Sequence, residues 1–247
     1  MNRILLVIGA CMLVFSAAQA QKIPAGAKAL LKAYPTHIRS YANNQLVFAD
    51  GTKLTYDDGK QKRLEERMDN ADPEDMFLMK YDITRWKPTY LYDPGRIRCE
   101  ALMKKLYGST PQEVEKQLIK IDWFGQQLKF TPACGAADSL KAVAHELAKH
   151  PELKKYLQKS STYYWRQVRG ANRLSAHSYG MTIDICVDYS NFWQWSNKGK
   201  SESDEIKYVN RIPHELVQIF ERHGFIWGGR WYHYDTMHFE FRPELFY

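Results

Sequence analysis

The sequence predicts an α+β fold in which an antiparallel sheet is flanked by helices. Two segments near the C-terminus, residues 181–187 and 237–242, alternate apolar and polar side chains as half-buried strands do. Residues 46–56 predict a hairpin, with Asp50-Gly51 as the turn between its two strands. Three longer segments repeat apolar residues at the spacing of helices.

The first of the helical segments spans residues 109–124 and has a clear start. Thr110 is placed as the N-cap and Pro111 at the first helical position, with Glu113 three residues after the cap. This pattern is a capping box with a permitted proline. Residues 59–75 are very polar and predict a surface helix that ends in a loop.

The other two helical segments, residues 135–159 and 211–225, carry stripes of apolar side chains. The second begins at Pro213 and stops at Gly224. The residues predicted to face the core are Leu140, Val143, Leu147, Leu216, Val217 and Phe220. The histidines of these segments are interpreted as surface or helix-end residues and not as ligands: His145, His150, His214 and His223.

The first twenty residues have the layout of a secretory signal peptide. Arg3 supplies positive charge, residues 4–15 form an apolar run, and Ala18-Gln19-Ala20 matches a small-x-small cleavage site. No later segment approaches the ~20 apolar residues that cross a bilayer. We therefore expect an exported protein, periplasmic or extracellular, with no transmembrane segment in the mature chain. A lipoprotein anchored at Cys11 is the less favoured alternative, because the apolar run continues past that cysteine.

The chain is basic, with a formal net charge of +7. This charge suits work beside an anionic surface such as a cell wall, or an ordinary solvated surface. Lysine and arginine form no dense block with interleaved aromatic residues, so the sequence gives no indication of a nucleic-acid partner.

The two C-terminal strand segments each have one apolar and one polar face. The apolar faces hold Met181, Ile183, Ile185 and Val187 in one segment, and Met237, Phe239 and Phe241 in the other. The polar faces hold Thr182, Asp184 and Cys186, and His238, Glu240 and Arg242. If both strands lie in one sheet with these polar faces aligned, Asp184 and His238 meet.

A third residue completes a candidate metal site. Catalytic zinc takes three protein ligands and keeps a fourth position open for water. His177, Asp184 and His238 supply two imidazoles and one carboxylate, and Asp235 lies three residues before His238, where it can act as a base without binding the metal. The helical motif His-Glu-x-x-His is absent, so the site is expected on strands and loops. Zn²⁺ is the expected ion, with manganese and cobalt as alternatives.

Two spaced motifs resemble the zinc D-alanyl-D-alanine carboxypeptidase and dipeptidase family. That family includes VanY-type carboxypeptidases and L-alanyl-D-glutamate endopeptidases of phage lysins. SAHSYGMTIDI is similar to its Ser-x-His-x-x-Gly-x-(Ala)-x-Asp motif. GFIWGGRWYHYDTMHFEF is similar to its Gly-Phe…Trp-Gly-Gly-x-Trp…Asp-x-Met-His-Phe-Glu block. The likeness covers residues 130–242 in the right order and implies a hedgehog/DD-peptidase-like fold whose antiparallel sheet carries the zinc site.

The resemblance assigns the same three zinc ligands and makes Asp235 the general base. It also offers Arg166, in the stretch YYWRQVRGANRLSAH, as the cation that faces the scissile carbonyl. Arg169 and Arg173 are close competitors for that role. Three aromatic residues either wall the cleft or pack in the core: Tyr179, Trp227 and Trp231.

Three positions depart from the family pattern. Some members carry glutamate where this chain has Asp235, Thr182 replaces an alanine, and Cys186 stands where asparagine is common. Cys186 as a fourth ligand would close the site and stop catalysis. We take it as a free buried thiol, which leaves Cys99 and Cys134 to pair in an exported protein.

The resemblance implies an exported zinc peptidase that cleaves the peptidoglycan stem peptide as a D-alanyl-D-alanine carboxypeptidase. One alternative is an L-alanyl-D-glutamate endopeptidase with the same chemistry. Another is a catalytically silent zinc-binding interaction module, because the fold is shared with the hedgehog signalling domain. The expected organisation is a signal peptide at 1–20, an N-terminal accessory region at 21–95 and a catalytic domain at 96–247.

Overall fold

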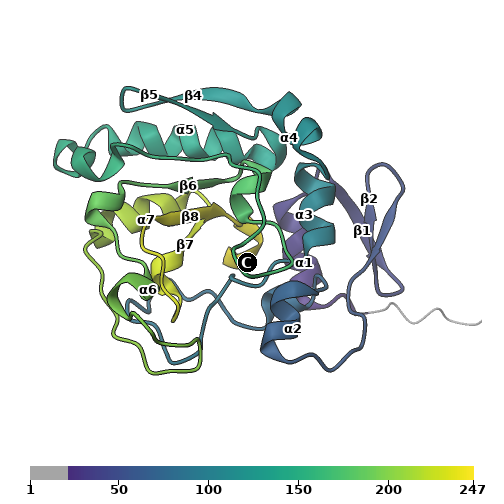
Figure 1. Cartoon of the computed structure of the whole chain (residues 1–247). Coiled ribbons are helices and arrows are strands. Elements are labelled where there is room, and N and C mark those ends of the chain that lie inside the picture. The colour runs from purple at the N-terminus through teal and green to yellow at the C-terminus, as the bar shows by residue number, and fades with distance from the viewer. Residues whose placement is uncertain (1–21) are drawn as a thin grey trace, which may run out of the picture.

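The computed structural model describes residues 22–247, which form a mixed α and β architecture (Figure 1). The helices are α1 (Ala25–Ala33), α2 (Leu64–Asp69), α3 (Glu100–Tyr107), α4 (Pro111–Gln117), α5 (Ala136–Leu147), α6 (Trp193–Ser196) and α7 (His214–Arg222). The strands are β1 (Ile38–Ala42), β2 (Gln45–Phe48), β3 (Lys53–Thr55), β4 (Ile119–Trp123), β5 (Gln126–Phe130), β6 (Thr182–Asp184), β7 (Phe225–Trp227) and β8 (His238–Phe241). The predicted signal peptide and Cys11 lie outside the described residues. Within residues 22–247 no helix has both the length and the apolar character that crossing a membrane requires.

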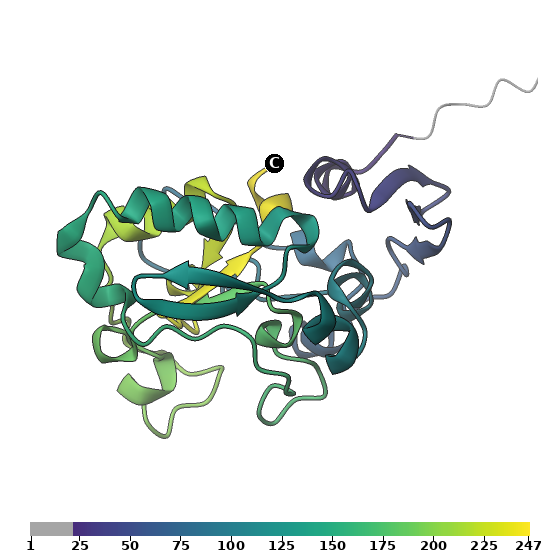
Figure 2. The ribbon, with the colours of Figure 1, turned by 90° about the horizontal axis from the view of Figure 1, so that it is seen from above.

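The C-terminal sheet has the order β6-β8-β7, and both of its strand pairs are antiparallel. Helix α7 packs against β7 and against α5, and α5 packs in turn against β4 (Figure 2). Phe220 of α7 stacks on Phe239 of β8 with ring centroids 4.0 Å apart, and Phe225 meets Phe220 edge-on at 5.6 Å. This aromatic core fixes the sheet to the helices, as expected for an α+β fold.

Residues near the two ends of the described chain pack together. Helix α1 contacts the C-terminal turn Pro243–Phe246, and the C-terminus lies beside α1 in both views (Figures 1 and 2). The hydroxyl of Tyr34 donates to Glu244 Oε2 at 2.5 Å, and both residues are buried. Leu30 and Tyr34 belong to the same hydrophobic cluster as Phe239. The region 21–95 therefore contributes to the main core, and a domain boundary at residue 95 stays a prediction.

The predicted hairpin over residues 46–56 is confirmed as β2 and β3, with Gly51 at φ +82° in the turn. The predicted N-cap is also confirmed, because Thr110 Oγ1 accepts a hydrogen bond from the backbone N–H of Glu113 at 3.2 Å. The predicted length of that helix is wrong. Helix α4 ends at Gln117, and the following residues form β4, which buries Ile121 and Trp123 against the core. Tertiary burial of alternate side chains here outweighs the helical spacing.

The predicted stripes of α5 and α7 are buried, with every one of the six side chains at most 1% exposed. The strand predicted for residues 181–187 is shorter than expected. It ends at Asp184, and Val187 lies in a 3₁₀ turn with 50% of its surface exposed. Beyond Asp184 the chain leaves the sheet, and the backbone N–H of Cys186 donates to the carbonyl oxygen of Tyr156.

The predicted Cys99–Cys134 disulfide is wrong, because the three cysteines of residues 22–247 are all free. Cys99 lies in the hydrophobic core at the start of α3, and burial raises the pKa of its thiol to about 11. Cys134 follows β5 in a separate turn, with Sγ 3.7 Å from His37 Nδ1. Cys186 is free and 2% exposed, as predicted.

Candidate metal centre

The turn that carries His177 fixes the orientation of its ring. Residues Ala176–Tyr179 form a single 3₁₀ turn, and Gly180 ends it with φ +66°, a left-handed conformation that favours glycine. Nδ1 of His177 lies 2.5 Å from the carbonyl oxygen of Thr162. A carbonyl only accepts, so Nδ1 carries the proton and Nε2 is left free to face Asp184.

Strands β6 and β8 bring the other two predicted ligands together. The antiparallel register pairs Asp184, the last residue of β6, directly with His238, the first residue of β8. His238 Nδ1 lies 3.1 Å from Asp184 Oδ1, and His177 Nε2 lies 3.1 Å from Asp184 Oδ2. The centroids of the two imidazole rings are 5.3 Å apart. The prediction that the two polar faces align and that Asp184 meets His238 is confirmed.

This triad has the donor set of a divalent cation site. One donor atom from each of the three residues lies within 4.8 Å of the others. The second nitrogen of each ring also has an acceptor, which is Thr162 for His177 and, at 3.4 Å, Glu240 Oε2 for His238. Histidines that bind metals characteristically donate their other N–H in this way. The triad therefore fits Zn²⁺, with Nε2 of His177, a carboxylate oxygen of Asp184 and Nδ1 of His238 as the ligand atoms.

The charges of the triad are strongly coupled. Burial raises the pKa of Asp184, but the two imidazole rings outweigh burial and hold the pKa well below its usual range. Burial lowers the pKa of His238, but its hydrogen bonds to Asp184 and Glu240 bring the pKa up to about 10. In the absence of a cation, His238 is therefore protonated at neutral pH and Asp184 is ionised.

Asp235 lies at the entrance to β8, as predicted. Its pKa is raised to about 7 by burial and by the negative charge of Asp184. Its Oδ1 is buried and has no hydrogen-bond partner among residues 22–247. The backbone position is fixed by a bond from its N–H to the carbonyl of Gly228 at 3.0 Å. A Cβ on Gly228 would lie 2.5 Å from the Asp235 carbonyl oxygen, so this close approach requires glycine.

The three candidate arginines are in different surroundings. The backbone of Arg166 is hydrogen-bonded to the His177 turn, because its N–H donates to Ser178 Oγ at 3.0 Å. Its side chain is exposed, and the guanidinium donates to the carbonyl of Gln167 at 3.4 Å. Arg169 is also exposed, whereas Arg173 forms an ion pair with Asp69. No contact joins the Arg166 side chain to the triad, and its role stays a prediction.

Segment 93–98, with the sequence DPGRIR, supports the site and was missed by the sequence analysis. Arg98 donates to Glu240 Oε2 at 3.0 Å, directly behind His238. Arg242 donates to the carbonyl of Gly95 at 3.0 Å and to Glu240 Oε1 at 3.0 Å. Burial raises the pKa of Glu240, but the Arg98 guanidinium holds it well below its usual range. Charges of alternating sign at every second position of the C-terminal stretch HFEFRPE were the available signal for buried counter-ions.

This network corrects the expectation that the 237–242 strand is half-buried. Glu240 and Arg242 are both 0% exposed, as is Phe239 on the other face. The strand is covered on both sides because ion pairs satisfy its charges. Among the predicted aromatic residues, Trp227 and Tyr179 are part of the core cluster. Trp231 belongs to a second buried cluster with Ile226 and Leu245, and its ring centroid lies 5.4 Å from that of His238.

Comparison with known proteins points to the same part of the chain. The model of a family described as D-alanyl-D-alanine carboxypeptidase matches residues 169–241. This stretch contains all three members of the triad and Asp235, but it omits Arg166 and segment 93–98. Searches of curated proteins and of solved structures returned no match.

Proposed function

We propose that this chain is an exported zinc peptidase that hydrolyses the D-alanyl-D-alanine bond of the peptidoglycan stem peptide. The observation that carries the proposal is the convergence of His177, Asp184 and His238 donor atoms within 4.8 Å of one another. The family match over residues 169–241 supports the reaction class and the substrate. Export follows from the signal-peptide pattern of residues 1–20 and agrees with a substrate that lies outside the cytoplasm.

His177, Asp184 and His238 would hold the cation. When bound, Zn²⁺ supplies Lewis acidity, which polarises a peptide carbonyl and makes water more acidic. Thr162 and Glu240 hold the protons of the two rings away from the cation. The rings are thereby kept in the tautomers that binding requires.

Asp235 is the proton carrier in this mechanism. With a pKa of about 7 in the metal-free protein, its carboxylate can accept the proton of an attacking water and return it to the leaving amine. The water oxygen first bonds to the carbonyl carbon, and the carbon–nitrogen bond then breaks as the amine takes up the proton. Arg166, on the segment beside the His177 turn, would neutralise the negative charge that develops on the carbonyl oxygen.

Mass spectrometry of muropeptides incubated with the zinc-loaded protein tests the proposal. Loss of one alanine from pentapeptide stems is the expected result. Release of a larger stem fragment would instead identify the protein as an endopeptidase that uses the same chemistry. Unchanged muropeptides, with stoichiometric zinc bound, would overturn the hydrolase and favour a silent binding module.

A further inference from the structure

A small pocket adjoins the groups that support the candidate metal centre. It lies between the end of α2, Arg98, the start of α3 and segment 173–179. Its volume is about 10 Å³, which is room for one particle the size of a water molecule. The proposed chemistry makes no use of this pocket.

Two contacts connect the pocket to the proposed zinc ligands. Tyr179, which lines it, belongs to the turn that carries His177. Arg98, which also lines it, donates to Glu240 Oε2 at 3.0 Å, and that oxygen lies 3.4 Å from His238 Nε2. Nε2 is the ring nitrogen that the cation does not use. The pocket is therefore reached from the rear of the ring, away from the position of the cation.

The pocket contains hydrogen-bond donors that have no acceptor. Tyr179 is 2% exposed, and its buried hydroxyl has no partner among residues 22–247. Nε of Arg173 is also buried without a partner in the same part of the chain. The Arg98 side chain makes one hydrogen bond there, from Nη1 to Glu240, which leaves its other N–H groups for the pocket. A buried donor without an acceptor is costly, and a guanidinium can only donate.

The two carboxylates that line the pocket do not supply the missing acceptor. Asp69 forms its ion pair with Nη1 of Arg173. Glu100 binds Lys104 Nζ through Oε1 at 2.6 Å and accepts the backbone N–H of Leu174 through Oε2 at 2.9 Å. Both acids are thus used by other groups, and neither bonds to the free hydroxyl or to the free Nε.

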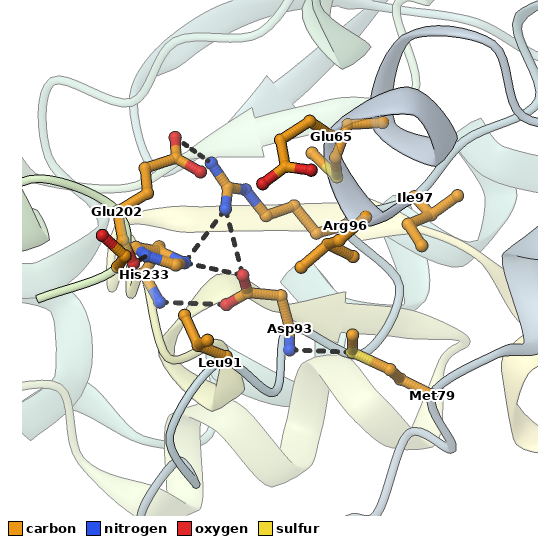
Figure 3. A pocket seen from close by; sticks show the side chains of 11 residues that line it. Glu65, Met79, Leu91, Asp93, Arg96, Ile97, Glu202 and His233 are labelled. Carbon is orange, nitrogen blue, oxygen red and sulfur yellow. Dashed lines mark hydrogen bonds and ion pairs between the residues drawn. The ribbon is translucent and has the colours of Figure 1, made fainter. Parts of the chain in front are cut away.

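A larger cavity at segment 93–98, with a volume of about 100 Å³, differs in this respect (Figure 3). Its guanidinium, from Arg96, lies 3.0 Å from Asp93 and 3.1 Å from Glu202. Asp93 also meets His233 at 2.7 Å. The charged donors of that cavity already have carboxylate partners, so it has no need of an added anion.

Positive charge gathers at the smaller pocket. Burial lowers the pKa of Arg98, and the charges of Arg242 and Arg173 lower it further, although Glu240 opposes the shift. A guanidinium keeps its charge in proteins, so the surplus is relieved by an anion and not by loss of a proton.

We propose that this pocket binds a chloride ion, held by the Tyr179 hydroxyl, Nε of Arg173 and the Arg98 guanidinium. The volume has no room for a polyatomic anion such as phosphate or a carboxylate. The ion supplies the missing acceptor and ties the His177 turn to the arginine that supports Glu240. This inference does not depend on the proposed peptidase activity.

Bromide, which scatters X-rays anomalously, tests the position of the ion. Crystals of the protein soaked in sodium bromide should show an anomalous peak at hydrogen-bonding distance from the Tyr179 hydroxyl and Arg173 Nε. Crystals of Tyr179→Phe should lack this peak.

Thermal unfolding in sodium chloride and in sodium gluconate of equal concentration tests binding in solution, because gluconate is too large for the pocket. Chloride at ten times its Kd should raise the Tm of a chain of this size by about 3–6 °C. Tyr179→Phe should lose this shift and be at least as stable as the wild-type protein in gluconate, because it removes a donor that has no partner there. Tyr107→Phe is the matched control, since Tyr107 is 0% exposed and lies outside the lining, and it should keep the shift.

An anomalous peak, together with a Tm shift that only Tyr179→Phe loses, supports the assignment. A map with only water at this position overturns it. A peak without a chloride effect in solution would mean an adventitious ion only, and it would overturn the proposal as well. A chloride effect that Tyr179→Phe retains, or that Tyr107→Phe loses equally, would place the ion elsewhere and have the same consequence.

Discussion

Asp184 and His238 occupy a directly paired position of strands β6 and β8, and their side chains meet with Asp184 Oδ1 3.1 Å from His238 Nδ1. The backbone ladder therefore fixes two of the three proposed ligands relative to one another. His177 comes from a turn and completes the triad through its bond to Thr162. We therefore expect that removal of the turn ligand disturbs the fold least.

We expect His177→Ala to lose stoichiometric zinc while remaining folded, because two ligands hold zinc far more weakly than three. Atomic absorption on the dialysed protein measures the metal content. His145→Ala, on the exposed face of α5, serves as the control and should retain one zinc per chain. Full zinc occupancy in His177→Ala would contradict the ligand set.

Removing the metal should lower thermal stability. Zinc at 100 times its Kd stabilises the folded state by about 2.7 kcal/mol. For a chain of this size that corresponds to a fall in Tm of about 5–10 °C on chelation. Differential scanning calorimetry with and without a chelator measures it. His177→Ala should show no chelator effect, and an equal shift in that variant would place the metal elsewhere.

Asp235→Asn should lower kcat by about 10²–10⁴-fold, the usual contribution of a general acid–base group. Zinc content should stay at one per chain, because Asp235 is not one of the three proposed ligands. Peptide hydrolysis and metal content are measured on the same preparation. Normal turnover would rule out Asp235 as the proton carrier.

Glu240→Gln should weaken zinc binding by about 10–100-fold, the typical cost of losing a partner of a metal-binding histidine. Competition with a chromophoric chelator measures the Kd. Glu244→Gln is the matched control, because Glu244 is equally buried and bonds to Arg242 and Tyr34 but not to His238. Both variants should lose stability, and only Glu240→Gln should lose affinity. Equal Kd values for the two variants would assign Glu240 a structural role alone.

Zinc binding should release about one proton at pH 7.5. The pKa of His238 is about 10 in the metal-free protein, so the ring is protonated at this pH and must lose its proton to bind a metal. The apparent affinity for zinc should therefore increase as the pH is raised toward about 10, and it should decrease as the pH is lowered. Calorimetric titrations in buffers of different ionisation enthalpy count the protons. Binding without proton release would show that His238 is already neutral.

The sequence predicted the members of the triad through strand alternation together with the resemblance of two spaced motifs to a known family. Alternation along residues 181–187 and 237–242 placed Asp184 and His238 on facing sides, and the register confirms their contact. The glycine after the His177 turn is required by the local conformation. Alternation within each strand and the turn glycine depend on residues close together in the chain, which sequence patterns report well. The pairing of the two strands, 54 positions apart, entered the prediction only as a condition.

Features that depend on distant segments were not predictable in this way. Arg98 meets Glu240 across 142 positions of the chain, and no local pattern relates the two residues. The helix predicted over β4 failed for another reason. Its partner β5 follows directly in the chain, and pairing with β5 and burial of Trp123 outweighed the helical spacing. The disulfide prediction failed because it rested on the number of cysteines left over and not on their positions.

The network around Glu240 sets a practical limit on how far this protein can be shortened. A fragment trimmed to the matched stretch 169–241 would lack Arg98, Arg242 and Thr162, and so would lose the groups that neutralise Glu240 and orient His177. Such a fragment would keep every proposed zinc ligand and still bury an uncompensated carboxylate, at a cost of several kcal/mol. Expression boundaries for structural or inhibitor work should therefore retain α1 and segment 93–98 together with the C-terminal turn.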